Sequence, residues 1–130
     1  MTSYTSDQLR EILAQHARWR RGEGGARANL SRADLCGADL SRANLSGVYV
    51  ALNVKATAAP ARRATRSDGY EFFLWPTDAG WRVRAGCRFF TMDEAWLHWT
   101  TTRADTPLGD ESLDILTMFD LHIERVGGAS

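Results

Sequence analysis

Apolar residues recur at intervals of five between residues 26 and 50 of this chain. Small and large apolar residues occupy two fixed positions in each interval, at Ala28, Leu30, Ala33, Leu35, Ala38, Leu40, Ala43, Leu45, Val48 and Val50. This period matches neither the α-helix, with about 3.6 residues per turn, nor the two-residue alternation of a β-strand, so it indicates a repeat architecture. If each interval turns one corner of a solenoid, the apolar positions stack inward and pairs such as Ser31 and Arg32 face solvent.

The segment resembles the pentapeptide-repeat family, whose A(D/N)LXX unit forms one face of a right-handed, four-sided β-helix. The polar D/N position holds Asn29, Asp34, Asp39 and Asn44. The resemblance implies about one coil of β-helix, and a single coil leaves both ends of its apolar core open. We therefore expect other parts of the chain, or a second copy in a homo-oligomer, to cover these ends.

Residues 5–20 have the apolar spacing of an amphipathic helix. The apolar stripe repeats every three or four residues and consists of Leu9, Ile12, Leu13, His16 and Trp19. Thr5 and Gln8 form a candidate capping box at the start of this helix. Residues 9–30 resemble the lead-in of short phage and prophage pentapeptide-repeat proteins, which implies that the helix caps the coil. We predict that His16 is packed and hydrogen-bonded, rather than a ligand or a base.

The chain after the repeats predicts a different kind of structure. Residues 51–68 are rich in alanine and lack periodicity, which predicts a linker or loop. Aromatic residues favour a strand over 70–75 and a returning strand over 81–85, with Trp81, Val83 and Ala85 facing one way and Arg82 and Arg84 the other.

Two helices are predicted to follow this hairpin. Thr91 and Glu94 form a second capping box, which predicts a helix through residue 102. Thr106 and Pro107 begin another helix, whose apolar stripe runs through residues 110–126. The prediction is a mixed α/β fold. It has a capping helix and about one coil of β-helix over 1–50, a linker over 51–68, and a small ββα(α) domain over 69–130.

The tail is also similar to the tails of the short phage proteins. The matching residues are Ala85, Gly86, Cys87, Arg88, Phe90, Thr91, His98 and Trp99. No activity is implied by this similarity.

Composition limits the location and the chemistry of the protein. No apolar run approaches the ~20 residues of a membrane span, and the start of the chain lacks an apolar signal region. Two cysteines suit a reducing cytoplasm and give no metal-binding spacing, so no cofactor or metal is expected. Residues 1–66 carry eleven Lys/Arg against five Asp/Glu, and residues 67–130 carry five against eleven. These opposite charges could attract each other or an outside partner, or could simply be solvated.

Enzymatic candidates are weak. Cys87 and His98 could act as a nucleophile and its base, but no third orienting group is apparent. Asp34 and Asp39 occupy the ordinary polar slot of the repeat. Phosphate-loop, dinucleotide-binding and zinc-protease motifs are missing from the sequence. We therefore expect a protein that is not an enzyme, with a thiol or phosphoester hydrolase left open.

Arginines and aromatic residues of the second half suggest an anion-binding site. The candidate residues are Tyr70, Trp75, Trp81, Arg82, Arg84, Arg88 and His98. Guanidinium groups bind phosphate and indole rings stack on bases, so a small nucleotide-like anion is the expected ligand. The resemblance to phage proteins suggests that the protein sequesters a host signal as a counter-defence factor in the host cytoplasm. Alternatives are a solvated strand face, binding of nucleic acid through the basic half, or binding of a host protein.

Overall fold

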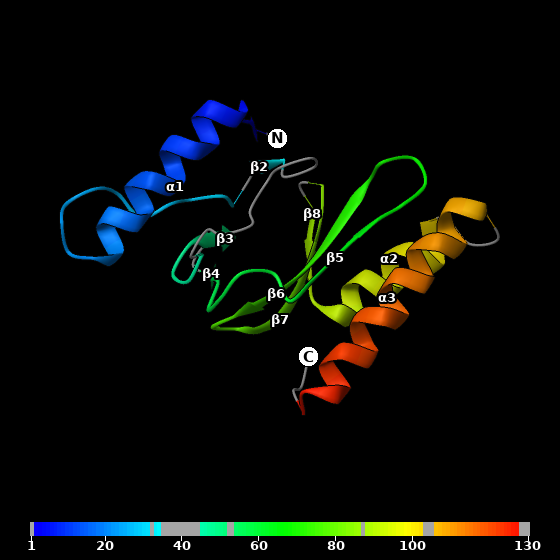
Figure 1. Cartoon of the computed structure of the whole chain (residues 1–130). Coiled ribbons are helices and arrows are strands. Elements are labelled where there is room, and N and C mark those ends of the chain that lie inside the picture. Colours follow the sequence, from blue (N-terminus) through cyan, green and yellow to red (C-terminus); the bar gives the residue numbers. More distant parts are fainter. Residues whose placement is uncertain are drawn as a thin grey trace.

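The computed structural model describes residues 2–31, 33–34, 45–51, 54–86, 88–102 and 106–127. It is a mixed structure of helices and strands (Figure 1). The helices are α1 (Ser6–Arg20), α2 (Met92–Thr102) and α3 (Pro107–Arg125). The strands are β1 (Thr2–Ser3), β2 (Ala33–Asp34), β3 (Tyr49–Ala51), β4 (Val54–Lys55), β5 (Arg62–Thr65), β6 (Glu71–Thr77), β7 (Gly80–Ala85) and β8 (Arg88–Phe90).

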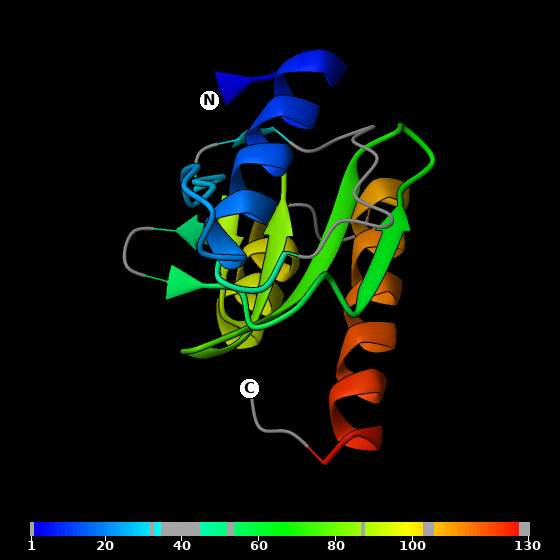
Figure 2. The same cartoon turned by 60° about the vertical axis from the view of Figure 1, so that its left-hand side comes forward.

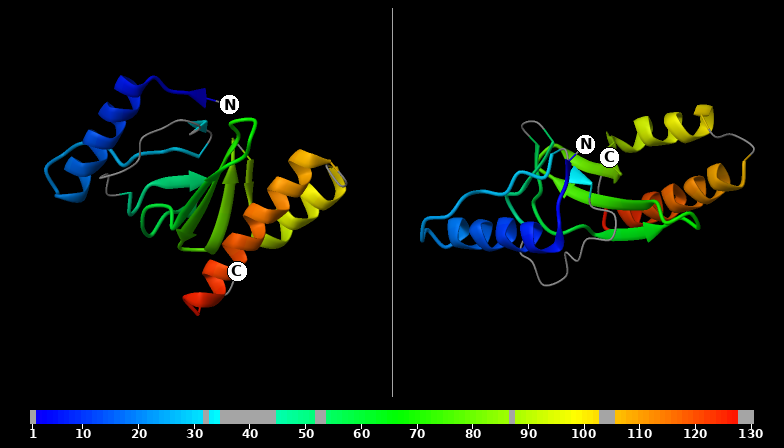
Figure 3. Two further views of the ribbon diagram at one scale, coloured as in Figure 1. Left: turned by 45° about the vertical axis from the view of Figure 1, so that its right-hand side comes forward. Right: turned by 90° about the horizontal axis from the view of Figure 1, so that it is seen from above.

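An antiparallel sheet with the order β5-β6-β7-β8 forms the centre of the molecule. Helices α2 and α3 cover one of its faces, and α1 lies with β3 and β4 on the other side (Figures 1 and 3). Successive side chains of β6 point to opposite faces, which is why this strand is buried along nearly its whole length. The predicted hairpin is confirmed as β6 and β7, in which Leu74 pairs with Val83 and Phe73 with Arg84.

The two faces of the sheet build two separate hydrophobic cores. Toward α2 and α3, the core contains Phe72, Leu74, Val83, Ala85, Met92, Ala95, Trp99, Ile115, Leu116, Phe119 and Ile123. Toward α1, the core contains Leu9, Ala28, Leu30, Leu45, Val48, Val50, Ala56, Phe73 and Trp75. The sheet therefore joins the repeat segment to the C-terminal helices through alternate residues of the same strand.

Helix α1 packs against the repeat segment (Figure 2), as the apolar stripe predicted. The capping box is confirmed, because Thr5 Oγ1 accepts a hydrogen bond from Gln8 N at 3.0 Å and Gln8 Oε1 accepts one from Thr5 N at 2.9 Å. His16 is fully buried: its Nδ1 accepts from Ala28 N at 3.1 Å, and its Nε2 donates to Ser46 O at 2.9 Å. The prediction that this histidine is packed and hydrogen-bonded is confirmed.

The repeat segment forms short strand pairs in the part of the chain that the structure describes. Strands β1 and β2 are parallel, β3 and β4 are antiparallel, and Asn29 bridges Tyr49. Leu30 and Leu45 are fully buried, as the inward-facing leucine position requires. No closed β-helix is formed by these described residues. The expected coil of β-helix is therefore not found in this part of the chain. Leu35 and Leu40 lie outside the described residues.

The predicted linker over residues 51–68 is corrected by the presence of strands. Strand β5 pairs with β6 through Arg62, Arg63, Ala64 and Thr65, and Ala56 bridges Thr77. The strand forms at the edge of the sheet, where Arg62 and Arg63 remain exposed while Arg62 donates to His122 and Arg63 pairs with Glu71. An edge strand of this kind needs little apolar alternation, so the sequence pattern did not indicate it.

Both C-terminal helices begin at the predicted residues. Thr91 Oγ1 accepts from Glu94 N at 3.1 Å, and Thr91 N donates to Glu94 Oε1 at 2.8 Å. Thr106 caps α3 by accepting from Gly109 N at 3.0 Å, with Pro107 in the first turn. None of the described helices combines the length and apolarity that a membrane crossing requires.

Candidate anion-binding site

A cavity of about 180 Å³ lies where the β5–β6 turn, β8 and α2 meet. Its walls are formed by Arg66, Tyr70, Arg88, His98 and Trp99. Three of these residues, Tyr70, Arg88 and His98, belong to the predicted set. The cavity thus brings two arginines, a histidine and two aromatic rings together, although they come from three separate stretches of the chain.

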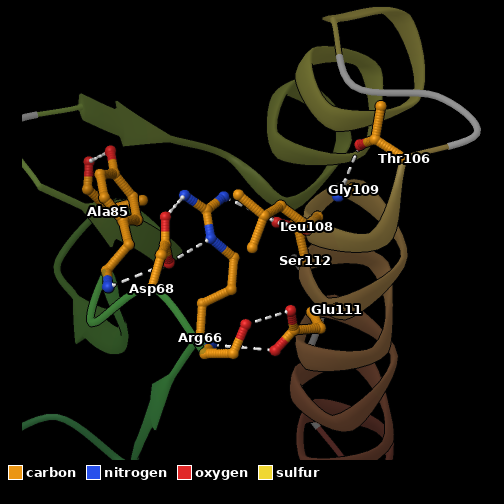
Figure 4. Close-up of polar contacts among 10 residues, drawn as sticks. Arg66, Asp68, Ala85, Thr106, Leu108, Gly109, Glu111 and Ser112 are labelled. Atoms are coloured by element: carbon orange, nitrogen blue, oxygen red, sulfur yellow. Dashed lines mark hydrogen bonds and ion pairs between the residues drawn. The ribbon is translucent and has the colours of Figure 1, made fainter.

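Arg66 is held in place by a network of hydrogen bonds (Figure 4). Its Nε and Nη2 atoms donate to the two carboxylate oxygens of Asp68 at 2.8 and 2.7 Å, and its Nη1 donates to Ser112 Oγ at 3.1 Å. The neighbouring Ser67 binds Glu111 through both its backbone N–H and its hydroxyl. These contacts tie the β5–β6 turn to the first turns of α3.

The ion pair between Arg66 and Asp68 largely cancels the charge of this arginine. Hydrogen bonding from the Arg66 guanidinium lowers the pKa of the Asp68 carboxyl from 3.8 to about 2. The same bond raises the pKa of Arg66. The guanidinium carbon also lies 4.7 Å from the centre of the Tyr70 ring. Arg66 therefore acts as a fixed wall of the cavity, with most of its donors already in use.

The Tyr70 hydroxyl and ring are both held by contacts with the sheet. Its hydroxyl donates to Ala85 O at 2.7 Å, and the ring meets Phe72 edge to face at 5.6 Å. Gly86 adopts a positive φ of 60°, and a Cβ atom there would lie 2.8 Å from Tyr70 Oη. Glycine at position 86 thus serves both the turn and the close approach of the tyrosine.

Arg88 supplies the available positive charge of the site. It opposes Ala85 across the β7–β8 pair, which places it on the same face of the sheet as α2 and α3. Its side chain is exposed, and among the described residues it has no ion-pair partner. An exposed guanidinium beside a polar cavity can bind a carboxylate or phosphate with two parallel hydrogen bonds.

His98 and Trp99 form the α2 wall. The His98 ring lies 5.2 Å from the ring of Phe90 and 4.7 Å from that of Trp99, measured between centroids. Trp99 is almost fully buried and also contacts Phe72, so it belongs to the core below the cavity. The aromatic packing fixes the position of the His98 ring at the cavity wall.

The other predicted residues lie elsewhere, so the seven candidates do not form one cluster. Trp75 is fully buried in the core toward α1, and Arg84 is fully buried on the same face, where its Nη1 donates to Leu30 O at 2.5 Å. Arg82 is also on this face and donates to Trp81 O at 2.9 Å. Trp81 faces α3, with its ring 5.8 Å from that of His122. The prediction that Arg82 and Arg84 share one face of the returning strand is confirmed. The expectation that this face is solvated is wrong at Arg84, which is buried.

Arg66 and Trp99 line the cavity but were not among the seven candidate residues. Arg66 was assigned to the predicted linker, and its partner Ser112 is 46 positions away in the sequence. The pattern Arg66-x-Asp68-Gly69 was the available signal, because an arginine two residues before an aspartate and a glycine suits an ion-paired turn.

The structure does not describe how the residues considered for catalysis are arranged. Cys87, the side chain of Asp34, and Asp39 lie outside the described residues. Within the residues that are described, no three His, Cys, Asp or Glu side chains are arranged to hold a metal ion.

Several arginines of the basic half are engaged within the chain. Arg10 pairs with Asp7 at 2.9 Å. The guanidinium of Arg27 lies 4.0 Å from the ring centre of Trp19 and donates to Tyr49 Oη at 3.2 Å. The Arg27 contacts attach α1 to the repeat segment and occupy one face of Trp19.

Comparison with known proteins identifies the repeat segment. The family model for pentapeptide repeats (8 copies) matches residues 26–49, so this part of the chain consists of pentapeptide repeats. No curated protein and no solved structure matches the chain.

Proposed function

We propose that the protein binds a small anionic ligand at the cavity between β8 and α2 and holds it without chemical conversion. The observation that carries this proposal is the exposed Arg88 guanidinium, which has no ion-pair partner among the described residues. It stands at a cavity whose other cation, Arg66, is already neutralised by Asp68. An incoming anion would therefore neutralise the positive charge of Arg88.

The size of the cavity limits the part of a ligand that it can enclose. At about 180 Å³ it is smaller than typical sites for drug-sized ligands, which measure roughly 300–1,000 Å³. It suits one phosphate-sized group paired with Arg88, while the rest of a nucleotide-like ligand would lie outside the cavity. Sequestration of such a ligand would withhold a host signal from its receptor, which is the counter-defence role expected from the sequence.

Isothermal titration with inorganic phosphate and with a nucleoside monophosphate tests this proposal. Arg88→Gln should weaken binding at least tenfold, because it removes the charge at the cavity. Arg82→Gln is the matched control, since Arg82 lies on the opposite face of the sheet. Recovery of the unchanged nucleotide would support binding without conversion. Equal binding by the wild type and Arg88→Gln, or no binding by either, would refute the proposal.

A further inference from the structure

The side of α3 that faces away from the sheet carries apolar side chains. Met118 is 38% exposed and Leu121 is 53% exposed, whereas Ile115, Leu116 and Phe119 on the other side of this helix are buried. Helix α3 contacts α2 and packs its buried side into the core that it shares with the sheet, and none of the described helices or strands lies over its outer side (Figures 1 and 3). These two neighbouring side chains form the apolar centre of the outer side of α3.

The other contacts of α3 define where this outer side lies. Asp120 accepts a hydrogen bond from Trp96 Nε1 at 2.7 Å and so faces α2. His122 accepts one from Arg62 Nε at 3.2 Å and so faces β5. A stripe with four-, three- and four-residue spacing runs between these two directions on the outer side. This outer stripe consists of Asp114, Met118, Leu121 and Arg125.

The outer stripe is complementary to itself when two copies run antiparallel. Its apolar pair lies in the middle, its acidic residue at one end and its basic residue at the other. With a two-fold axis between residues 119 and 120, Met118 lies opposite the partner's Leu121. In the same register Asp114 lies opposite the partner's Arg125, twice by symmetry. Within the described residues, neither Asp114 nor Arg125 has an ion-pair partner in its own chain.

We propose that the outer stripe of α3 is the contact surface of a two-fold symmetric homodimer. The spacing of its members is that of an antiparallel coiled-coil seam, in which side chains four and three residues apart face the partner helix. A parallel arrangement would place Asp114 beside Asp114 and Arg125 beside Arg125, and repulsion between like charges disfavours it. The charges therefore favour a second copy of α3 as the partner, and they favour the antiparallel orientation.

Charge reversal tests this interface, with dimerisation measured by sedimentation velocity over a concentration series. Asp114→Arg and Arg125→Asp should each weaken dimerisation about tenfold, because each places like charges opposite one another twice. The double variant Asp114→Arg/Arg125→Asp should restore the wild-type dissociation constant to within about threefold. Leu121→Glu should give a monomer. Arg10→Asp, on α1 across the sheet, is the control and should leave the dimer unchanged.

Circular dichroism of each variant shows that the chain still folds. A wild-type protein that is monomeric at high concentration would overturn the proposal. So would a double variant no better than the single ones, because the antiparallel register would then be wrong. Phosphate binding does not enter this test, since the outer stripe shares no residue with the cavity.

Discussion

Arg66 Nη1 donates a hydrogen bond of 3.1 Å to Ser112 Oγ, and this contact joins the β5–β6 turn to α3. Both residues are buried, so the loss of one partner leaves a buried polar group without compensation. Arg66 also lines the cavity, and the contact therefore fixes the position of one cavity wall.

Ser112→Ala should lower the free energy of unfolding by about 1–2 kcal/mol, because a buried arginine donor loses its acceptor. Thr117→Ala is a matched control on the same helix. Both hydroxyls donate to the carbonyl four residues earlier, but Thr117 is exposed. Urea denaturation should show a change below about 0.5 kcal/mol for Thr117→Ala. Equal effects of the two substitutions would contradict the role assigned to the Arg66 contact.

The Asp68 carboxyl should titrate with a pKa of about 2, because the Arg66 guanidinium donates two hydrogen bonds to it. The pKa is lowered in the folded state, so the stabilisation is complete above pH 3.8 and is lost as the pH falls toward 2. NMR titration of the carboxyl carbon measures this directly. Arg66→Gln should return the pKa toward 3.8. An unchanged pKa in that variant would show that another group causes the shift.

Acidification should destabilise the protein through His16. Burial lowers the pKa of this histidine below its ordinary value of 6.5, and the positive charges of Arg20 and Arg27 add to the effect, against a hydrogen bond to Ser46. The unfolded chain therefore binds the proton more tightly, so stability is complete above pH 6.5 and falls as the pH drops below it. The slope is at most about 1.4 kcal/mol per pH unit.

Denaturant unfolding at pH 7.5 and pH 5.5 checks this prediction. His16→Gln should remove most of the pH dependence in this range and should also lower stability at pH 7.5. His122→Gln is the control, because His122 is half-buried whereas His16 is fully buried, and the slope assigned to His16 should remain in it. Retention of the full slope in His16→Gln would assign it to another group.

Gly86→Ala should destabilise the protein by about 1–3 kcal/mol, since the new Cβ would meet Tyr70 Oη and would sit at a positive φ. Tyr70→Phe removes the atom that is approached most closely. The cost of Gly86→Ala should therefore be smaller in the Tyr70→Phe background than in the wild type. A thermodynamic cycle of the four proteins measures this difference. Strict additivity would mean that the Tyr70 hydroxyl does not contribute, so that the backbone conformation and the remaining ring atoms oppose alanine.

Local signals in the sequence were enough to place the helices. The capping residues Thr5, Thr91 and Thr106 each act through a side chain within three residues of its partner, so the sequence contains the whole interaction. The alternation in β7 likewise gave the correct facing of Val83 and Arg84, because strand periodicity is a local property.

The cavity could be predicted only in part, because its walls depend on contacts between distant residues. The chemistry of Tyr70, Arg88 and His98 suggested them, and they do line the cavity. Trp75 and Arg84 lie apart from them because they are on the face of the sheet that packs toward α1. Strand β5 brings Arg66 to the cavity, and pairing with β6 stabilises that strand more than its own composition does. Pairing with a neighbour is not visible in a single segment of sequence.

The most direct test of anion binding at the cavity is a titration with inorganic phosphate, followed through the indole N–H signals of uniformly ¹⁵N-labelled protein. Trp99 lines the cavity, whereas Trp19 lies with α1 on the other side of the sheet. The account predicts a saturable shift of the Trp99 signal, no shift of Trp19, and loss of the Trp99 response in Arg88→Gln. A shift at Trp19 alone would place anion binding on the basic half. A spectrum unchanged by phosphate would contradict the account.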